Sequence, residues 1–158
     1  MNGYHILMLT DHAAHSAENS LYALASAIYV QPDCLLLDIA SRSTPANRAF
    51  FDGDVNGQLA VVQIHNDLDF DDMQERFTTA QPDGDVQDYD FIILRLPPPL
   101  SRTFAEALTS VFDDRCIINR PAGIFTTGSK EFLLQFPELC PPIAMIRTPE
   151  DLLAFSGR

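Results

Sequence analysis

The chain has 158 residues, of which 46% are hydrophobic and 11 are phenylalanine. This length fits one domain, because single hydrophobic cores are built from roughly 100–200 residues, and the apolar content argues against wholesale disorder. The formal net charge is −12 with only 10 lysines and arginines, so nucleic-acid binding is disfavoured by net repulsion from a polyanionic backbone. Small anions remain candidate ligands, since a few arginines can create a local positive field.

Targeting and membrane signals are absent from the sequence. No basic region precedes a long apolar stretch at the N-terminus, and no apolar run approaches the roughly 20 residues that span a bilayer. We therefore expect a cytoplasmic protein with no membrane partner. Cys34, Cys116 and Cys140 are odd in number and widely spaced, so thiols in a reducing compartment are favoured over metal ligands or nucleophiles.

The opening of the chain has the pattern of a strand–helix–strand unit. The apolar run at 4–10 ends at Asp11 and is typical of a buried parallel strand. Apolar residues then recur at helical spacing over 21–29 until Pro32 stops the pattern, and the run at 34–39 predicts the second strand. Such a unit crosses over right-handed, so the sequence predicts an α/β fold.

Between residues 41 and 88 the pattern changes. Apolar runs at 49–51 and 59–62 flank Asn56-Gly57, which is a strong signal for a type I′ hairpin. The acidic stretch at 67–85 is poor in β-branched residues and is expected to be a loop, and it lacks the Gly and Glu of a calcium loop. We therefore expect a β-hairpin and acidic-loop excursion over 41–88.

The α/β alternation resumes with a buried-strand pattern at 89–94, which ends at Arg95 before a run of prolines. Ser101 can cap a helix with one apolar face, and residues 116–118 form the next short strand. Together these elements predict a small, parallel, Rossmann-like sheet with helices on both faces. The remainder predicts short elements: helices at about 122–126 and 129–136, a strand at 141–146, and a helix that begins after Thr148.

No recognisable motif encodes a complete active site. GxGxxG after a strand, GxxxxGK[ST], GxSxG, CxxC and HExxH are all absent, and His12 and His15 lack a placed third metal ligand. Asp11 and Arg95 each follow a buried strand, and ligands of parallel α/β sheets bind outside the carboxyl ends of strands. An arginine fork there suits a carboxylate or a phosphate; alternatively, both charges mark only the exit from the core.

Lys130 lies in the first turn of a predicted helix, where a cation opposes the helix dipole. That placement favours an anionic ligand beside it. A solvated surface lysine is the alternative, because one such charge costs only a few tenths of a kcal/mol.

Three stretches occur in a notable order. They are residues 8–11 with the helix at 20–24, residues 55–58, and a long stretch that runs from 90–95 and Pro98-Pro99 through 117–121 and 130–132 to Pro141-Pro142. In this order they resemble the N-terminal region of bacterial glutathione synthetases. The long stretch is similar to that family's D-x-ILMRxDPP, IVNxP and EKLF elements, although Leu96-Pro97 stands in place of the lysine and aspartate before Pro98-Pro99.

The resemblance implies a pre-ATP-grasp domain over 1–140 and the truncated start of an ATP-grasp region over 141–158. By the same resemblance, Lys130 corresponds to an ATP-contacting lysine and Arg95 to a substrate-side arginine. Asp11, which matches the family's first strand and its turn, is assigned to the substrate side as well. The family's magnesium-binding carboxylates belong to the ATP-grasp region.

The resulting hypothesis is the substrate-side N-terminal domain of an ATP-dependent carboxylate–amine ligase, inactive by itself. ATP and Mg²⁺ would bind the complete enzyme and not this chain alone. Expected partners are an ATP-grasp domain in cis or in trans, a small peptide or amino-acid substrate, and a second copy in a homo-oligomer. The alternative is a stand-alone, non-catalytic binding or regulatory module. A flavodoxin-like nucleotide binder is disfavoured, because the first loop has no glycine to cradle phosphate.

Overall fold

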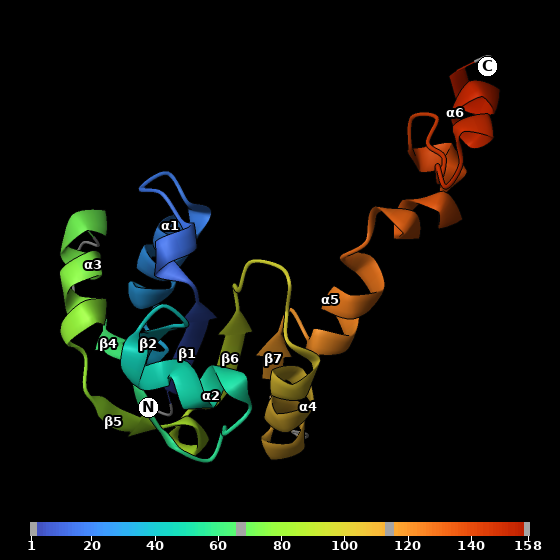
Figure 1. Cartoon of the computed structure of the whole chain (residues 1–158). Coiled ribbons are helices and arrows are strands. Elements are labelled where there is room, and N and C mark those ends of the chain that lie inside the picture. Colours follow the sequence, from blue (N-terminus) through green and yellow to red (C-terminus); the bar gives the residue numbers. More distant parts are fainter. Residues whose placement is uncertain (1–2, 66–68, 113–115, 157–158) are drawn as a thin grey trace. The chain divides into compact units, whose positions relative to one another are not determined.

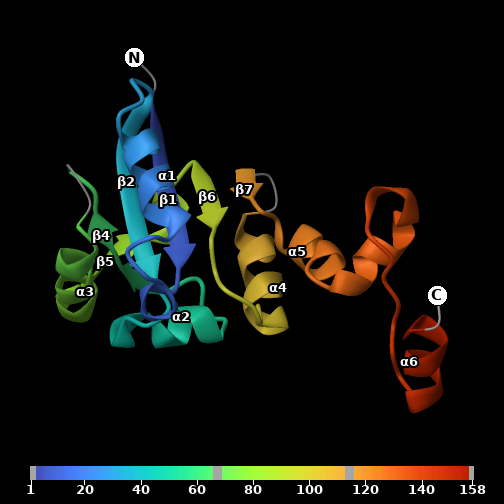
Figure 2. The ribbon, with the colours of Figure 1, turned by 90° about the horizontal axis from the view of Figure 1, so that it is seen from above.

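The computed structural model describes residues 3–65, 69–112 and 116–156. The chain divides into two compact units, Met1–Arg120 and Pro121–Arg158. The first unit contains a mixed, mostly parallel five-stranded sheet in the order β4-β2-β1-β6-β7 (Figures 1 and 2). Its strands are β1 (Tyr4–Thr10), β2 (Cys34–Ser41), β4 (Val62–Gln63), β6 (Phe91–Leu94) and β7 (Cys116–Ile118). The predicted α/β class is confirmed.

β1 is the central strand of this sheet. It pairs in parallel with β2 on one side and with β6 on the other, so that Met8 lies between Ile39 and Ile93. These three side chains are buried, which explains why the strands read as apolar runs without alternation. β2 and β6 lie on opposite sides of β1, so the order in which the chain adds strands reverses at β1. In open α/β sheets, ligands bind at such a reversal, outside the carboxyl ends of the strands.

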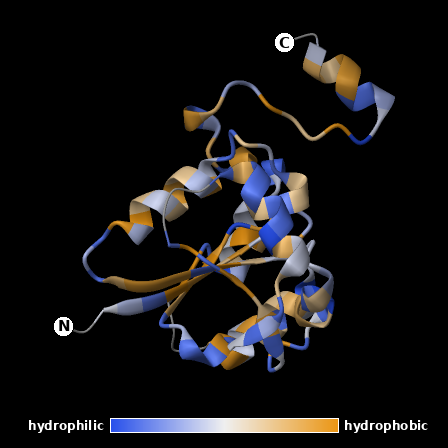
Figure 3. Ribbon diagram, turned by 90° about the vertical axis from the view of Figure 1, so that its left-hand side faces the viewer, coloured by the Kyte–Doolittle hydropathy of each residue, from blue (hydrophilic) through white to orange (hydrophobic). Residues whose placement is uncertain are grey.

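Helices cover both faces of the sheet (Figure 3). α1 (Ser20–Tyr29) and α3 (Phe70–Thr79) lie on one face. Together with every second residue of the strands, they form a hydrophobic core, to which the helices contribute Leu21, Ala25, Met73 and Phe77. The other helices of this unit are α2 (Arg48–Asp52) and α4 (Arg102–Val111), joined by aromatic contacts. The ring of Phe104 lies 5.3 Å from the ring of Phe51.

The hairpin predicted around Asn56-Gly57 is not confirmed. Residues 49–51 belong to the helix α2, which ends at Gly53 with a φ of 121° that glycine adopts without a Cβ clash. β3 (Gln58–Ala60) pairs with β5 (Pro82–Asp85) in a separate antiparallel sheet. The physical reason is packing, since the helix lets both Phe50 and Phe51 reach the interior.

The acidic stretch predicted as a loop contains the helix α3. The carboxylate of Asp69 accepts hydrogen bonds from the backbone N–H groups of Asp71 (2.8 Å) and Asp72 (3.3 Å), and acidic residues in a first turn favour the helix dipole. Met73 and Phe77 are buried one helical turn apart. The acids therefore begin a helix, while residues 67 and 68 lie outside the described part of the chain.

The second unit consists of short helical elements. They are α5 (Pro121–Thr127), η4 (Lys130–Gln135), η5 (Pro137–Leu139) and α6 (Pro149–Ser156), of which η4 and η5 are 3₁₀ turns. The helices expected after Arg120 and after Thr148 are confirmed. The strand expected at 141–146 is wrong, since these residues form no strand and both sheets are built from strands of the first unit.

Three shorter 3₁₀ turns connect elements of the first unit: η1 (His12–Ala14), η2 (Pro45–Asn47) and η3 (Val86–Asp88). No helix among the described residues combines the length and the apolar character needed to cross a membrane.

Asn47 joins the end of β2 to β3. Its side chain is fully buried and donates to the backbone oxygens of Ser41 (3.1 Å) and Ala60 (2.8 Å), while its Oδ1 accepts from the N–H of Ala60 (2.7 Å). One amide thus hydrogen-bonds three backbone groups, of which the oxygen of Ser41 also accepts from the N–H of Thr44 (3.2 Å).

We expect Asn47→Ala to lower the free energy of unfolding by about 2–4 kcal/mol, because each buried backbone group left unsatisfied costs roughly 1–3 kcal/mol. Urea denaturation measures this change. The matched control is Asn56→Ala in the exposed turn, which should change stability by less than about 0.5 kcal/mol. Equal effects of the two substitutions would contradict this role of Asn47.

Candidate functional site

The carboxyl ends of β1, β2 and β6 meet at one edge of the sheet, because these strands are parallel; the arrowheads of β1 and β6 point the same way in Figure 1. Asp11, Arg42 and Arg95 each follow the last residue of one of these strands. The hydroxyl of Thr10 donates to the backbone oxygen of Arg95 (3.3 Å), and the N–H of Arg95 donates to the oxygen of Leu9 (2.8 Å). The structure therefore brings Asp11 and Arg95 to the same edge, as their sequence positions predict.

Asp11 is held by Arg42. Its Oδ2 accepts from Nε (3.0 Å) and from Nη2 (2.9 Å) of the guanidinium, and its side chain is only 14% exposed. Oδ1 is buried and has no hydrogen-bond partner among the described residues. Arg42 also donates to the backbone oxygen of Pro99 (3.5 Å). Asp11 is therefore partly committed to an internal ion pair that fixes the loop after β1 against the loop after β2, and Arg42 links both to the loop after β6.

Arg95 is half-buried beside the N-terminus of α1. Its Nη2 donates to the hydroxyl of Ser20 (2.8 Å), the first residue of that helix. The side chain of Asn19 caps the helix by accepting from the N–H of Leu21 (2.9 Å). A guanidinium has five N–H donors, and a helix N-terminus adds positive potential, so this corner can attract a carboxylate or a phosphate.

His15 lies within electrostatic reach of both charges. Burial lowers the pKa of His15, Asp11 raises it, and Arg95 lowers it further. The ring is thus favoured in its neutral form, and its Nδ1 is buried without a partner among the described residues. A neutral imidazole beside Arg95 leaves the local positive charge to the arginine and offers one acceptor or donor of its own.

His12 is buried and packs against aromatic side chains. It is 1% exposed, its Nδ1 lies 2.5 Å from the hydroxyl of Tyr22, and its ring stacks on Phe70 at 4.5 Å. Burial is the largest cause that lowers the pKa of His12, and His15 lowers it too. Within the described ranges, no group of three or more metal-ligating side chains could hold an ion. His12 therefore anchors η1 beneath α1 and α3.

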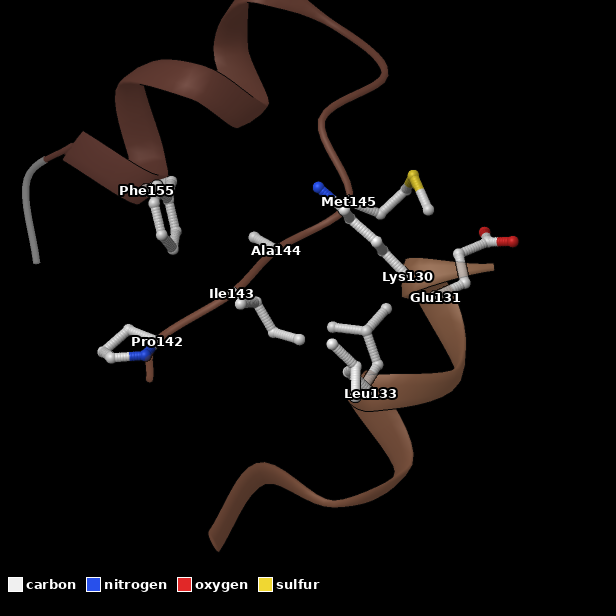
Figure 4. Close-up of a pocket in the computed structure, with 9 residues that line it drawn as sticks. Lys130, Glu131, Leu133, Pro142, Ile143, Ala144, Met145 and Phe155 are labelled. Carbon is white, nitrogen blue, oxygen red and sulfur yellow. The ribbon is translucent and has the colours of Figure 1, made fainter. Parts of the chain in front are cut away.

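Lys130 belongs to the second unit, where it is the first residue of η4 and is exposed. It is the sole lysine of the sequence. Lys130 lines a cavity of about 410 Å³, whose wall is mainly apolar and includes Leu133, Ile143, Met145 and Phe155 (Figure 4). Such a cavity can take a flat apolar group, with the ammonium of Lys130 at one side for an anion.

Sequence reasoning missed Arg42 and the role of Ser20, and it considered His15 only as a metal ligand. Arg42 directly follows a parallel strand, as Asp11 and Arg95 do, so the rule that singled out those two also applies to it. Ser20 and His15 carry no signal of their own, because their roles depend on where α1 and η1 are placed in space.

The chain is similar to parts of longer proteins. It is 28% identical over 131 residues to a glutathione synthetase of Rhodopseudomonas palustris, and the aligned residues cover 77% of this chain and 40% of that protein. It is 26% identical over 92 residues to a glutathione synthetase of Bradyrhizobium diazoefficiens, covering 56% of this chain and 29% of that protein. A glutathione synthetase of Brucella melitensis is 22% identical over 116 residues, covering 71% and 36%.

These similarities support a distant relationship to glutathione synthetases. The chain spans 40% or less of the length of these curated relatives. No family model matches the chain, and no solved structure matches it.

Because the folded protein disfavours a charged His12, we expect stability to fall as the pH falls. The pKa of His12 is lowered from 6.5, so on acidification the unfolded chain takes up this proton before the folded chain does. The contribution of neutral His12 to the free energy of unfolding is fully present above pH 6.5. It is lost progressively as the pH falls from there to the lowered pKa of the folded protein. Urea denaturation at a series of pH values measures it.

His12→Phe removes this titration and should flatten the pH dependence below pH 6.5 relative to the unsubstituted protein. His65→Gln, at an exposed position, serves as the control and should keep the original slope. If His12→Phe and the unsubstituted protein lost the same free energy on acidification, a buried neutral His12 would be ruled out.

Proposed function

We propose that this chain is the substrate-side, pre-ATP-grasp domain of an ATP-dependent carboxylate–amine ligase related to glutathione synthetase. The observation that carries the proposal is the similarity to three glutathione synthetases, of which the longest match covers 131 residues. The mostly parallel sheet, with Arg95 at the carboxyl ends of its strands, is consistent with a domain that holds a small anionic substrate.

The reaction of such a ligase has two steps. The terminal phosphoryl group of ATP is transferred to a substrate carboxylate, which gives an acyl phosphate and ADP, and an amine then displaces inorganic phosphate to form the amide. ATP and Mg²⁺ supply the activation and the charge neutralisation. This chain's part is to bind and orient the acid or peptide substrate.

In this proposal Arg95 receives a carboxylate of a small peptide or amino-acid substrate. The N-terminus of α1 lies next to its guanidinium through Ser20, and the Asp11–Arg42 pair holds the neighbouring loops in place. Asp11, whose side chain is 14% exposed at the same edge, is proposed to attract an N–H of the same substrate by its negative charge. Opposite charges at one strand edge suit a molecule that carries both an amine and a carboxylate.

Lys130 is the residue proposed to contact ATP. Its cavity is apolar enough for an adenine ring and lies within the size range of ligand pockets, roughly 300–1,000 Å³. Mg²⁺ is proposed to be held by carboxylates of an ATP-grasp region, since the described residues bring together no set of ligands for it.

The second unit also favours a larger assembly. Pro121 is its one buried residue within the described range, whereas Leu139 and Leu153 are 77% and 72% exposed. Exposed apolar side chains in this number mark a surface that another part covers. We propose that an ATP-grasp region, in cis or in trans, covers it and that residues 141–158 open that region. A cytoplasmic location and a homo-oligomer stay predictions.

The chain alone should not turn over ATP. Incubation with ATP, Mg²⁺, γ-glutamyl dipeptides and glycine should release no ADP above a protein-free blank, because in this proposal the charges that stabilise phosphoryl transfer belong to the ATP-grasp region. Ligase turnover that co-purifies with the pure chain would contradict the assignment as a substrate-side domain.

In a ligase that carries this chain together with its ATP-grasp region, two substitutions should separate the two roles. Arg95→Ala should raise KM for the acid substrate about tenfold or more and leave KM for ATP unchanged, since a charge-assisted hydrogen bond contributes roughly 1.5–3 kcal/mol. Lys130→Ala should do the reverse. Steady-state kinetics with each substrate varied in turn measures both.

An exposed arginine serves as the control for these substitutions. Arg48, whose side chain is 88% exposed, should leave both KM values unchanged when replaced by alanine. A fully active ligase whose KM values ignore both Arg95→Ala and Lys130→Ala would remove these two residues from the site. A correctly folded assembly without ligase activity would instead favour the non-catalytic module.

A further inference from the structure

A second polar site lies away from the carboxyl edge, in the middle of β2. Asp38 lies between Leu7 of β1 and Gln63 of β4, and it is only 4% exposed. Because side chains alternate along a strand, Asp38 points to the opposite face from Leu37 and Ile39, which belong to the core under α1 and α3. It therefore lies on a different face from that core.

The carboxylate of Asp38 is only half satisfied. Its Oδ2 accepts a hydrogen bond of 2.6 Å from the hydroxyl of Tyr89. Its Oδ1 is buried and has no hydrogen-bond partner among the described residues, where no lysine or arginine forms an ion pair with it. Burying a carboxylate oxygen without a hydrogen bond is energetically unfavourable. A donor that bound Oδ1, above all a positively charged one, would remove this cost.

Asp38 also lines a cavity of about 280 Å³. Three further carboxylates, those of Asp83, Asp85 and Asp88, belong to exposed residues of its lining, and Leu36 and Val61 add apolar surface. Asp83 is near enough to Asp38 to raise the pKa of that carboxyl, although burial is the larger cause of its rise. The cavity thus has a buried carboxylate, an apolar wall and an acidic rim.

We propose that this cavity binds a small aliphatic amine, with one ammonium group on Asp38 and, in a diamine, a second ammonium group at the rim carboxylates. The alkyl chain then lies against Leu36 and Val61. This site is separate from the substrate edge proposed above and does not depend on the ligase assignment.

The geometry favours an ammonium over other cations. A guanidinium binds best to two oxygens of one carboxylate, whereas Oδ2 of Asp38 already accepts from Tyr89. An ammonium is a compact charge that needs only one free oxygen. The described residues also form no group suited to a metal ion, although four aspartates line the cavity.

The test is an NMR titration of the whole chain, ¹⁵N-labelled, with 1,4-diaminobutane at physiological salt, which screens general attraction to a chain of charge −12. We expect saturable shifts of the backbone amides of Leu36, Val61 and Gly84 in the millimolar range. The matched probe 1,4-butanediol has the same chain length without the charges and should cause no such shifts.

Two variants locate the contact. Asp38→Asn keeps an acceptor for Tyr89 but removes the charge, and should weaken diamine binding about tenfold or more. Asp83→Asn, at an exposed position, should weaken it several-fold, and Glu106→Gln removes one exposed charge outside the cavity and should leave affinity unchanged. Should Asp38→Asn fail to fold, the affinities of Asp83→Asn and Glu106→Gln for the diamine are compared, and a weaker affinity of Asp83→Asn supports binding at the cavity.

Several results would overturn the proposal. They are the lack of saturable shifts at the cavity, equal shifts with the diol, and equal affinities of Asp83→Asn and Glu106→Gln. Binding of Mg²⁺ or Ca²⁺ at these amides, without binding of the diamine, would likewise replace the amine site by a metal site.

Discussion

The structure of the first unit depends on the position of β1 between two parallel partners. A strand buried on both faces and paired on both edges has no polar backbone group left for water. Its side chains must be apolar throughout, as they are from Ile6 to Leu9, and its neighbours must run in the same direction. Polar functional side chains are therefore excluded from the middle of the strand and lie at its ends.

This displacement explains the composition of the carboxyl edge. Chain segments that leave adjacent parallel strands do so side by side, so Asp11, Arg42 and Arg95 converge although they are far apart in sequence. The same edge lies next to α1, whose N-terminus supplies Ser20. An acidic protein can thus present a local basic corner, because the distribution of its few arginines matters more than their number.

The sequence predicted those features that depend on one segment at a time. Apolar runs identified β1, β2, β6 and β7, and the strand-end rule placed Asp11 and Arg95 correctly. The errors lie where distant contacts outweigh local signals. The Asn56-Gly57 turn signal is overruled by the burial of Phe50 and Phe51 next to α4, and the acids near Asp69 proved to be a helix start. Ion pairs such as Asp11–Arg42 could not be foreseen, because they require the loops to be placed first.

The sole lysine of the sequence has a practical consequence. Reagents that couple to side-chain amines have a single target in this chain, and that target lies at the wall of the apolar cavity of the second unit. A dye or a tether joined there would report on the second unit. Labelling of a lysine side chain therefore occurs at one known residue, without prior removal of competing lysines.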